Sequence, residues 1–171
     1  LDSLCVQPFQ IVANLPYNIG TRLVLDFLHM SHKPKKMTLM LQKEVAQRMV
    51  ASPGGKHYGR LSIIVQWLAR ARVLFDVPAR AFKPEPKVVS SVIELIPRPW
   101  PLAEAEPDIL ELVTQKAFGQ RRKMMRVSLK TLHPDIVNLL QRVGVSPTRR
   151  PQDVTIREFC SIARELHSWS K

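Results

Sequence analysis

The chain has 171 residues, of which 45% are hydrophobic, and its 26 lysines and arginines against 14 acidic residues give a formal net charge of +12. This length and apolar content suffice for a buried core, and so positive a charge favours a phosphate-rich partner such as a nucleic acid. No apolar run approaches the ~20 residues of a transmembrane helix, and the first residues lack the segments of a secretion signal, so we expect a cytoplasmic protein with no membrane partner. Cys5 and Cys160 stand far apart and the five histidines show no ligand spacing, so we expect plain thiols and no metal site.

The first predicted element is a buried strand over residues 9–13, followed at once by Asn14, Leu15, Pro16 and Tyr17. Open α/β sheets bind ligands at the carboxyl ends of their strands. The Asn14 amide oxygen can accept a hydrogen bond from an amino group, Pro16 stiffens the turn so that nearby carbonyls can face the same amine, and Tyr17 offers a flat face to a base. Acceptors that hold the hydrogens of an aryl amine favour a pyramidal, more nucleophilic nitrogen. The turn therefore predicts a site where an exocyclic amine is alkylated.

The elements expected after this turn continue an α/β pattern. Thr21 is the predicted cap of a helix that ends before Pro34. Next come a strand over residues 37–41, helices over 43–50 and 61–68, and strands over 72–77 and 88–96. The last two strands lie close together in the sequence, which suits an antiparallel hairpin at the edge of the sheet.

A proline-rich linker around Trp100 separates this pattern from a wholly helical one. Gly144 is expected to stop one of the helices that follow. These helices are predicted over residues 109–118, 124–132, 136–143 and 156–167. The sequence thus predicts two domains, at residues 1–99 and 100–171, and an α/β fold followed by a small all-α domain.

The Asn-Leu-Pro-Tyr turn at residues 14–17 resembles the motif of the ribosomal RNA adenine N6,N6-dimethyltransferases. Five further blocks follow in the order of that family, at residues 18–21, 42–48, 58–62, 82–92 and 117–123. Leu15 and the block that begins at Gln42 are more similar to the enzymes of the small ribosomal subunit than to the antibiotic-resistance enzymes that modify large-subunit rRNA.

The resemblance implies a fold, an activity and a cofactor. Residues 1–99 are expected to be the carboxyl-terminal part of a Rossmann-like, S-adenosylmethionine-dependent methyltransferase domain, and residues 100–171 a helical rRNA-binding domain. The implied reaction is the transfer of methyl groups from S-adenosylmethionine to N6 of two adjacent adenosines near the 3′ end of small-subunit rRNA. The implied partners of this monomeric enzyme are that rRNA and the immature small subunit.

The chain lacks most of the residues that are expected to bind the cofactor implied by the resemblance. Gly20 is the first glycine of the sequence and lies after Asn14, so no glycine-rich loop precedes the catalytic turn. We therefore expect most of the S-adenosylmethionine site to lie outside this chain. The chain alone is expected to be inactive.

The resemblance also assigns roles to single residues. Asn14 accepts from N6–H and lies beside the methyl group of the cofactor, so it is expected to be both catalytic and cofactor-binding. The backbone carbonyls of Leu15 and Pro16 take further contacts with the amine. Tyr17 and Phe82 hold a flipped-out adenine between their rings. The ring of Tyr17, and not its hydroxyl, is therefore expected to matter.

The densest basic run carries no acid between its cations, which are Arg121, Arg122, Lys123, Arg126 and Lys130. On a helix, Arg122, Arg126 and Lys130 share one face. A solvated helix face is the plain interpretation of such a run. With the resemblance, contact with rRNA phosphates is the better interpretation, and Arg149 and Arg150 are further candidates.

Two other functions stay open. A non-catalytic rRNA-binding or ribosome-assembly factor could use the basic helical domain without any chemistry. DNA adenine and protein glutamine methyltransferases also bind the nitrogen that they methylate at such a turn, but they usually carry Pro-Pro-Tyr there. Leu15 and the block that contains Phe82 argue against them.

Overall fold

The computed structural model describes residues 8–169, which divide into two compact units. Residues up to Val50, together with Leu68–Trp100, form the first unit, and Ala51–Trp67 with the residues from Pro101 onward form the second. The second segment of the helical unit begins at Pro101, close to the domain boundary predicted at residue 99. Sequence patterns gave no sign that Ala51–Trp67 packs with the carboxyl-terminal helices.

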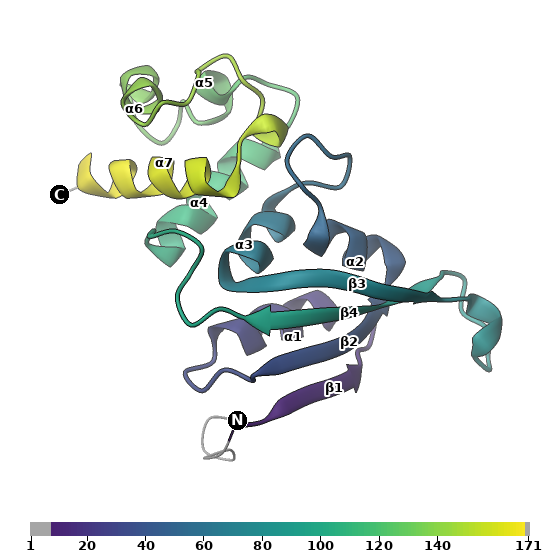
Figure 1. The fold of residues 1–171 in the computed structure, drawn as a ribbon. Coiled ribbons are helices and arrows are strands. Elements are labelled where there is room, and N and C mark those ends of the chain that lie inside the picture. Colours follow the sequence, from purple (N-terminus) through teal and green to yellow (C-terminus); the bar gives the residue numbers. More distant parts are fainter. Residues whose placement is uncertain (1–7, 170–171) are drawn as a thin grey trace. The chain divides into compact units, whose positions relative to one another are not determined.

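The first unit contains a four-stranded mixed sheet with the strand order β1-β2-β4-β3 (Figure 1). The strands are β1 (Gln10–Asn14), β2 (Lys36–Gln42), β3 (Ala69–Val77) and β4 (Ser90–Pro97). β1 and β2 are parallel, and β4 runs antiparallel to both β2 and β3. The predicted strands and the antiparallel hairpin at the sheet edge are confirmed.

One face of this sheet forms the core of the first unit. Alternate side chains of β2 and β4 are at most 2% exposed: Met37, Leu39, Leu41, Ile93 and Leu95. Helix α1 (Gly20–His29) buries Val24 and Leu28, and it lies behind the sheet in the view of Figure 1. Helix α2 (Lys43–Val50) begins directly after β2, as predicted. The strands therefore alternate as half-buried strands do, with one face packed against helices.

Helix α1 starts at Gly20, two residues before the start that a cap at Thr21 would give. Its cap position is Ile19, which makes no side-chain capping bond, so the prediction that Thr21 caps the helix is wrong. A Cβ on Gly20 would lie 2.7 Å from Cδ2 of Leu41, so a larger residue at this position would require the Leu41 side chain to move. The close approach of α1 to β2 fixes the turn that joins β1 to α1.

The second unit is helical throughout. It contains α3 (Arg60–Leu68) except for its last residue, and then α4 (Pro107–Gly119), α5 (Met125–Ser128), α6 (Ile136–Arg142) and α7 (Ile156–Trp169). Two 3-10 turns complete the fold, η1 (Ala79–Ala81) in the first unit and η2 (Pro151–Asp153) in the second. Gly144 follows α6 with φ +73°, as expected of a helix stop. The α/β class with a helical second part is confirmed.

An aromatic cluster joins the segment Ala51–Trp67 to the carboxyl-terminal helices. The ring of Tyr58 meets that of Phe118 edge-on, with 6.0 Å between centroids, and Phe118 lies 5.8 Å from Phe159. Burial, followed by the negative charge of Glu158, raises the pKa of Tyr58, so its hydroxyl stays a neutral donor. It donates to the carbonyl of Val154 at 2.9 Å.

Replacing Tyr58 by Phe is expected to destabilise the second unit by ~1–3 kcal/mol, because the buried carbonyl of Val154 loses its donor while the packing of the ring is kept. Urea denaturation of the 171-residue chain measures the free energy of unfolding. An unchanged free energy would mean that water replaces the hydroxyl.

The helix predicted over residues 124–132 is shorter in the structure, and the basic run around it is not helical throughout. α5 covers only Met125–Ser128, so Arg122 and Lys130 lie outside it and do not share a helix face with Arg126. The Ser128 hydroxyl is 3.3 Å from the carbonyl oxygens of both Met124 and Met125 and donates back to them, a side-chain interaction that competes with helix propagation.

Among residues 8–169, no helix is both long and apolar enough to cross a membrane. The same residues hold no group of three or more histidine, cysteine or acidic side chains placed to bind a metal ion. Cys160 is a free, buried thiol, and burial raises its pKa to about 12, which keeps it protonated and unreactive at neutral pH. Cys5 lies outside the described residues.

Candidate active site

The turn that follows β1 is held by backbone hydrogen bonds. The N–H of Leu15 donates to the carbonyl of Met40 at 3.2 Å, which ties the turn to β2. The carbonyl of Pro16 accepts two N–H groups, from Ile19 at 3.2 Å and Gly20 at 2.9 Å. Leu15 is 6% exposed and anchors the turn in the core, whereas the side chain of Asn14 is exposed at the carboxyl end of the strand.

These bonds change one expected role. A carbonyl oxygen has two lone pairs, and that of Pro16 already accepts two N–H groups at the start of α1. The Pro16 carbonyl therefore stabilises the turn, and its expected contact with a substrate amine would compete with these two bonds.

Tyr17 lies with its hydroxyl 2.8 Å from the Oγ of Ser90. Ser90 is fully buried, whereas Tyr17 is 39% exposed, so the ring is held at its hydroxyl and is otherwise partly open to solvent. No role is expected for this hydroxyl from the sequence, but in the structure its partner lies 73 residues away in the chain.

Phe82 is brought to the same place by the segment between β3 and β4. Pro78 starts the turn η1, and the N–H of Phe82 closes it by donating to the carbonyl of Ala79 at 3.1 Å. The peptide bond between Lys83 and Pro84 is cis.

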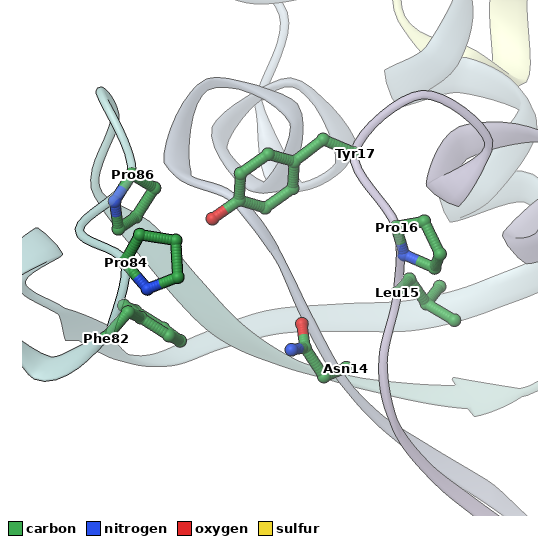
Figure 2. Close-up of a pocket in the computed structure, with 7 residues that line it drawn as sticks. All are labelled: Asn14, Leu15, Pro16, Tyr17, Phe82, Pro84 and Pro86. Carbon is green, nitrogen blue, oxygen red and sulfur yellow. The ribbon is translucent and has the colours of Figure 1, made fainter.

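A cavity of about 290 Å³ joins these elements. It is lined by Asn14, Leu15, Pro16, Tyr17, Phe82, Pro84 and Pro86 (Figure 2). The amide of Asn14 points toward the space between the rings of Tyr17 and Phe82. The cavity is close to the small end of the size range of ligand pockets. The structure therefore brings together the four residues of the turn and Phe82, and it adds Pro84 and Pro86 as lining residues.

A second polar network lies beside this cavity, at the same end of the sheet. The hydroxyl of Ser91 and the ammonium of Lys43 each donate to the carboxylate of Asp76, at 2.6 Å. These bonds, that of Lys43 first, hold the pKa of Asp76 below its ordinary value. The network joins the start of α2 to β3 and β4, and none of its three residues lines the cavity.

The arrangement suits chemistry on a flat amine. It offers an amide acceptor, two aromatic rings and no acid or base among the lining residues. Transfer to an aryl amine needs the nitrogen held in line with the donor more than it needs a proton acceptor, because the amine becomes acidic as it is alkylated. A planar base with an exocyclic amino group fits this set of side chains.

The five predicted cations belong to the second unit, whereas the residues that line this cavity belong to the first. Arg121 donates to the carbonyls of Gly55 and Lys56, at 3.2 and 2.8 Å, and thus holds the segment Ala51–Trp67 in place. The other four side chains are exposed: Arg122, Lys123, Arg126 and Lys130. Arg121, Arg122 and Lys123 also line a cavity of about 390 Å³ with Phe118, Gly119 and Gln120.

Arg149 has an internal partner. Its guanidinium pairs with the carboxylate of Glu158 at 2.5 Å and also donates to the carbonyl of Asp153. Burial raises the pKa of Glu158, but hydrogen bonds from Arg149 and Thr155 outweigh this effect and leave the pKa below its ordinary value. Arg149 therefore has a structural role, unlike the contact with phosphate considered for it.

Comparison with known proteins identifies relatives of the whole described chain. Residues 3–168 match the family described as "Ribosomal RNA adenine dimethylase". The chain is 48% identical over 162 residues to the ribosomal RNA small subunit methyltransferase A of Paracoccus denitrificans, covering 93% of this chain and 57% of the relative. It is 51% identical over 159 residues to that of Paramagnetospirillum magneticum, covering 93% and 56%. The chain thus spans a little over half the length of these relatives.

Solved structures show the same fold. A dimethyladenosine transferase from Plasmodium falciparum superposes with a TM-score of 0.79 at 23% identity, over 98% of this chain and 70% of that protein. The 23S rRNA methyltransferase ErmE superposes with a TM-score of 0.67 at 23% identity, over 95% and 67%. The Rossmann-like methyltransferase fold expected from the sequence is confirmed. From the match over residues 3–168 and the identity to these relatives, the chain belongs to the ribosomal RNA adenine dimethylase family.

Proposed function

We propose that this chain is part of an S-adenosylmethionine-dependent enzyme that dimethylates N6 of two adjacent adenosines near the 3′ end of small-subunit rRNA. The observation that carries the proposal is the cavity in which Asn14 and Tyr17 of one turn meet Phe82 of a distant segment. The relatives of similar sequence are named as methyltransferases of small-subunit rRNA. A net charge of +12 fits the immature small subunit as the partner of a monomer that acts in the cytoplasm.

In this proposal the adenine is flipped out of its strand and enters the cavity with its amino group toward Asn14. The Asn14 amide oxygen accepts one N6–H, and the backbone carbonyl of Leu15 accepts the other. Holding both hydrogens favours a pyramidal nitrogen whose lone pair points at the methyl donor. Tyr17 and Phe82 stack on the base and tolerate the positive charge that develops on it.

The cofactor supplies the methyl group when it is bound. Asn14 fits a place beside it, because its exposed amide lies at the carboxyl end of β1, where α/β sheets bind such ligands. We place most of the cofactor site on a further part of the protein, which together with this chain makes up the full-length enzyme. The relatives, of whose length this chain spans 57% and 56%, support that assignment.

Expression of the full-length enzyme in a bacterium without its own small-subunit dimethyladenosine transferase tests the proposal. Mass spectrometry of nucleosides should find dimethyladenosine in the small-subunit rRNA and none added to the large-subunit rRNA. Small-subunit rRNA that stays unmodified, although the protein sediments with the small subunit, would favour a non-catalytic assembly factor instead.

The helical unit is proposed to bind rRNA phosphates through its exposed cations. Replacing Arg122, Arg126 and Lys130 together by Gln should weaken the binding of small-subunit rRNA hairpins, and it should lower the slope of log affinity against log salt by up to about three. The reason is that each phosphate contact releases counterions when it forms. Binding is measured by fluorescence anisotropy at several salt concentrations.

A matched control replaces three other exposed cations of the second unit, Lys116, Arg157 and Arg164, by Gln. Both triple variants lose the same net charge. An equal change of slope in the two variants would show that the protein's overall charge, and not this run, governs binding.

A further inference from the structure

We propose that Ser90 is a positioning residue, which fixes the ring of Tyr17 in the orientation that stacks on the substrate adenine. The inference rests on the proposed function, because it concerns the base that this function places in the cavity. Neither the Ser90 hydroxyl nor the Tyr17 hydroxyl touches the reacting atoms in this account; they act through the ring.

The geometry of the contact supports this role. The Ser90 hydroxyl and the Tyr17 hydroxyl lie 2.8 Å apart, and Ser90 is 0% exposed. Ser90 is the first residue of β4, a central strand, and it is paired with Gln42 of β2 on one side and with Val77 of β3 on the other. The partner of Tyr17 is thus a short side chain on backbone that is held from both sides.

The ring of Tyr17 needs such a partner. At 39% exposed, the Tyr17 side chain is only partly packed, and its two side-chain torsions need a restraint to hold one orientation. A hydrogen bond at the hydroxyl acts at the atom farthest from the backbone, so it restrains both torsions. A ring that is already in place loses less conformational entropy when the base arrives, which favours capture and alignment of the base.

The same bond connects two walls of the cavity. Tyr17 belongs to the turn after β1, while Ser90 ends the segment that carries Phe82, Pro84 and Pro86. In Figure 2 the hydroxyl of Tyr17 points toward the side of the cavity where the two prolines lie. The bond between Tyr17 and Ser90 therefore also sets the spacing between the two aromatic rings that receive the base.

Ser91 provides a matched control. It is the neighbouring residue, has the same side chain and is also 0% exposed. Its hydroxyl donates to Asp76 at 2.6 Å, whereas the Ser90 hydroxyl is the one that meets Tyr17. Loss of a buried hydroxyl at the start of β4 is common to Ser90→Ala and Ser91→Ala, but release of the Tyr17 ring is expected only from the first.

The experiment compares Ser90→Ala, Tyr17→Phe, their double variant and Ser91→Ala in the full-length enzyme. Single-turnover methylation of unmodified small subunits gives the rate of transfer. A 3′ rRNA hairpin with 2-aminopurine at the target position reports stacking through its fluorescence lifetimes. Urea denaturation shows that each variant is folded.

Ser90→Ala and Tyr17→Phe should each slow transfer by roughly 2- to 10-fold, as loss of one hydrogen bond does, and the double variant should be no slower than either single variant. Both should reduce the short-lifetime, stacked fraction of 2-aminopurine, while Ser91→Ala leaves that fraction unchanged. Affinity for the hairpin should stay within about twofold, because phosphate contacts dominate it.

Three results would overturn the inference: transfer by folded Tyr17→Phe at the wild-type rate, additive losses in the double variant, or an equal drop of the stacked fraction in Ser91→Ala. Each of these leaves the proposed function intact, because the wild-type enzyme still methylates. A wild-type enzyme that fails to methylate small subunits contradicts the proposed function itself.

Discussion

Replacing Asn14 by Ala in the full-length enzyme is expected to lower kcat by about 10²- to 10³-fold with little change in the affinity for rRNA. The amide oxygen is proposed to accept from the amine most strongly as the nitrogen becomes pyramidal, so its loss falls on the transition state. The exposure of Asn14 at the strand end means that little packing is lost with it. Single-turnover methylation and hairpin binding measure the two quantities separately.

Gln10→Ala is the matched control for this prediction. Gln10 also carries an amide, is exposed on the same strand and lies at the opposite end of β1 from the cavity. The Gln10→Ala enzyme should methylate small subunits at the wild-type rate. A loss of less than about fivefold in Asn14→Ala, or a loss confined to KM, would remove Asn14 from the chemical step.

Replacing Tyr17 by Ala is expected to impair both capture of the base and turnover, by roughly 5- to 150-fold in kcat/KM. This range corresponds to the ~1–3 kcal/mol that stacking of one base on an aromatic ring contributes. Tyr17→Phe keeps the ring and loses only its tether to Ser90, so its loss should be smaller. Steady-state kinetics on unmodified small subunits, with mono- and dimethyladenosine followed separately, gives both parameters.

Ile19→Ala serves as the control for loss of an exposed apolar side chain near the turn. Ile19 is 44% exposed and does not line the cavity, so its variant should keep wild-type kinetics. If Tyr17→Phe were as slow as Tyr17→Ala, the Tyr17 hydroxyl itself would be essential for methyl transfer. The assignment of Tyr17 as a stacking residue would then be wrong.

Much of the first unit could be predicted from the sequence, because local patterns determine it. The apolar run before Asn14, the alternation in β2 and the prolines after β3 mark strands and turns without reference to distant residues. The turn residues and Phe82 could be placed in one site only through the family resemblance, since nothing local to residue 82 points to residue 17.

The features that the sequence did not reveal depend on contacts between distant segments. The close approach of α1 to β2 brings Gly20 against Leu41, 21 residues away. The bond from Ser90 to Tyr17 and those from Arg121 to Gly55 and Lys56 span 65 or more residues each. A basic run looks the same in sequence whether its arginines face solvent or backbone carbonyls.

The short α5 shows a different limit. The spacing of Arg122, Arg126 and Lys130 fits a helix, but the backbone is bound elsewhere: the N–H of Met125 donates to the carbonyl of Arg149 at 2.8 Å, and that of Arg126 to Pro147 at 3.0 Å. Such tertiary hydrogen bonds override the helical pattern of a charged run.

The most direct test of the central claim is to incubate the full-length enzyme and its Asn14→Ala variant with S-adenosylmethionine and unmodified small subunits, and to locate the products by mass spectrometry of rRNA fragments. With the wild-type enzyme, dimethyladenosine is expected at two adjacent positions near the 3′ end. With the variant, almost none is expected at the same time point, although both proteins bind the subunit equally. Two adenosines left unmodified by the wild-type enzyme would contradict the proposed function, and dimethylation at the same rate by Asn14→Ala would contradict the role of Asn14.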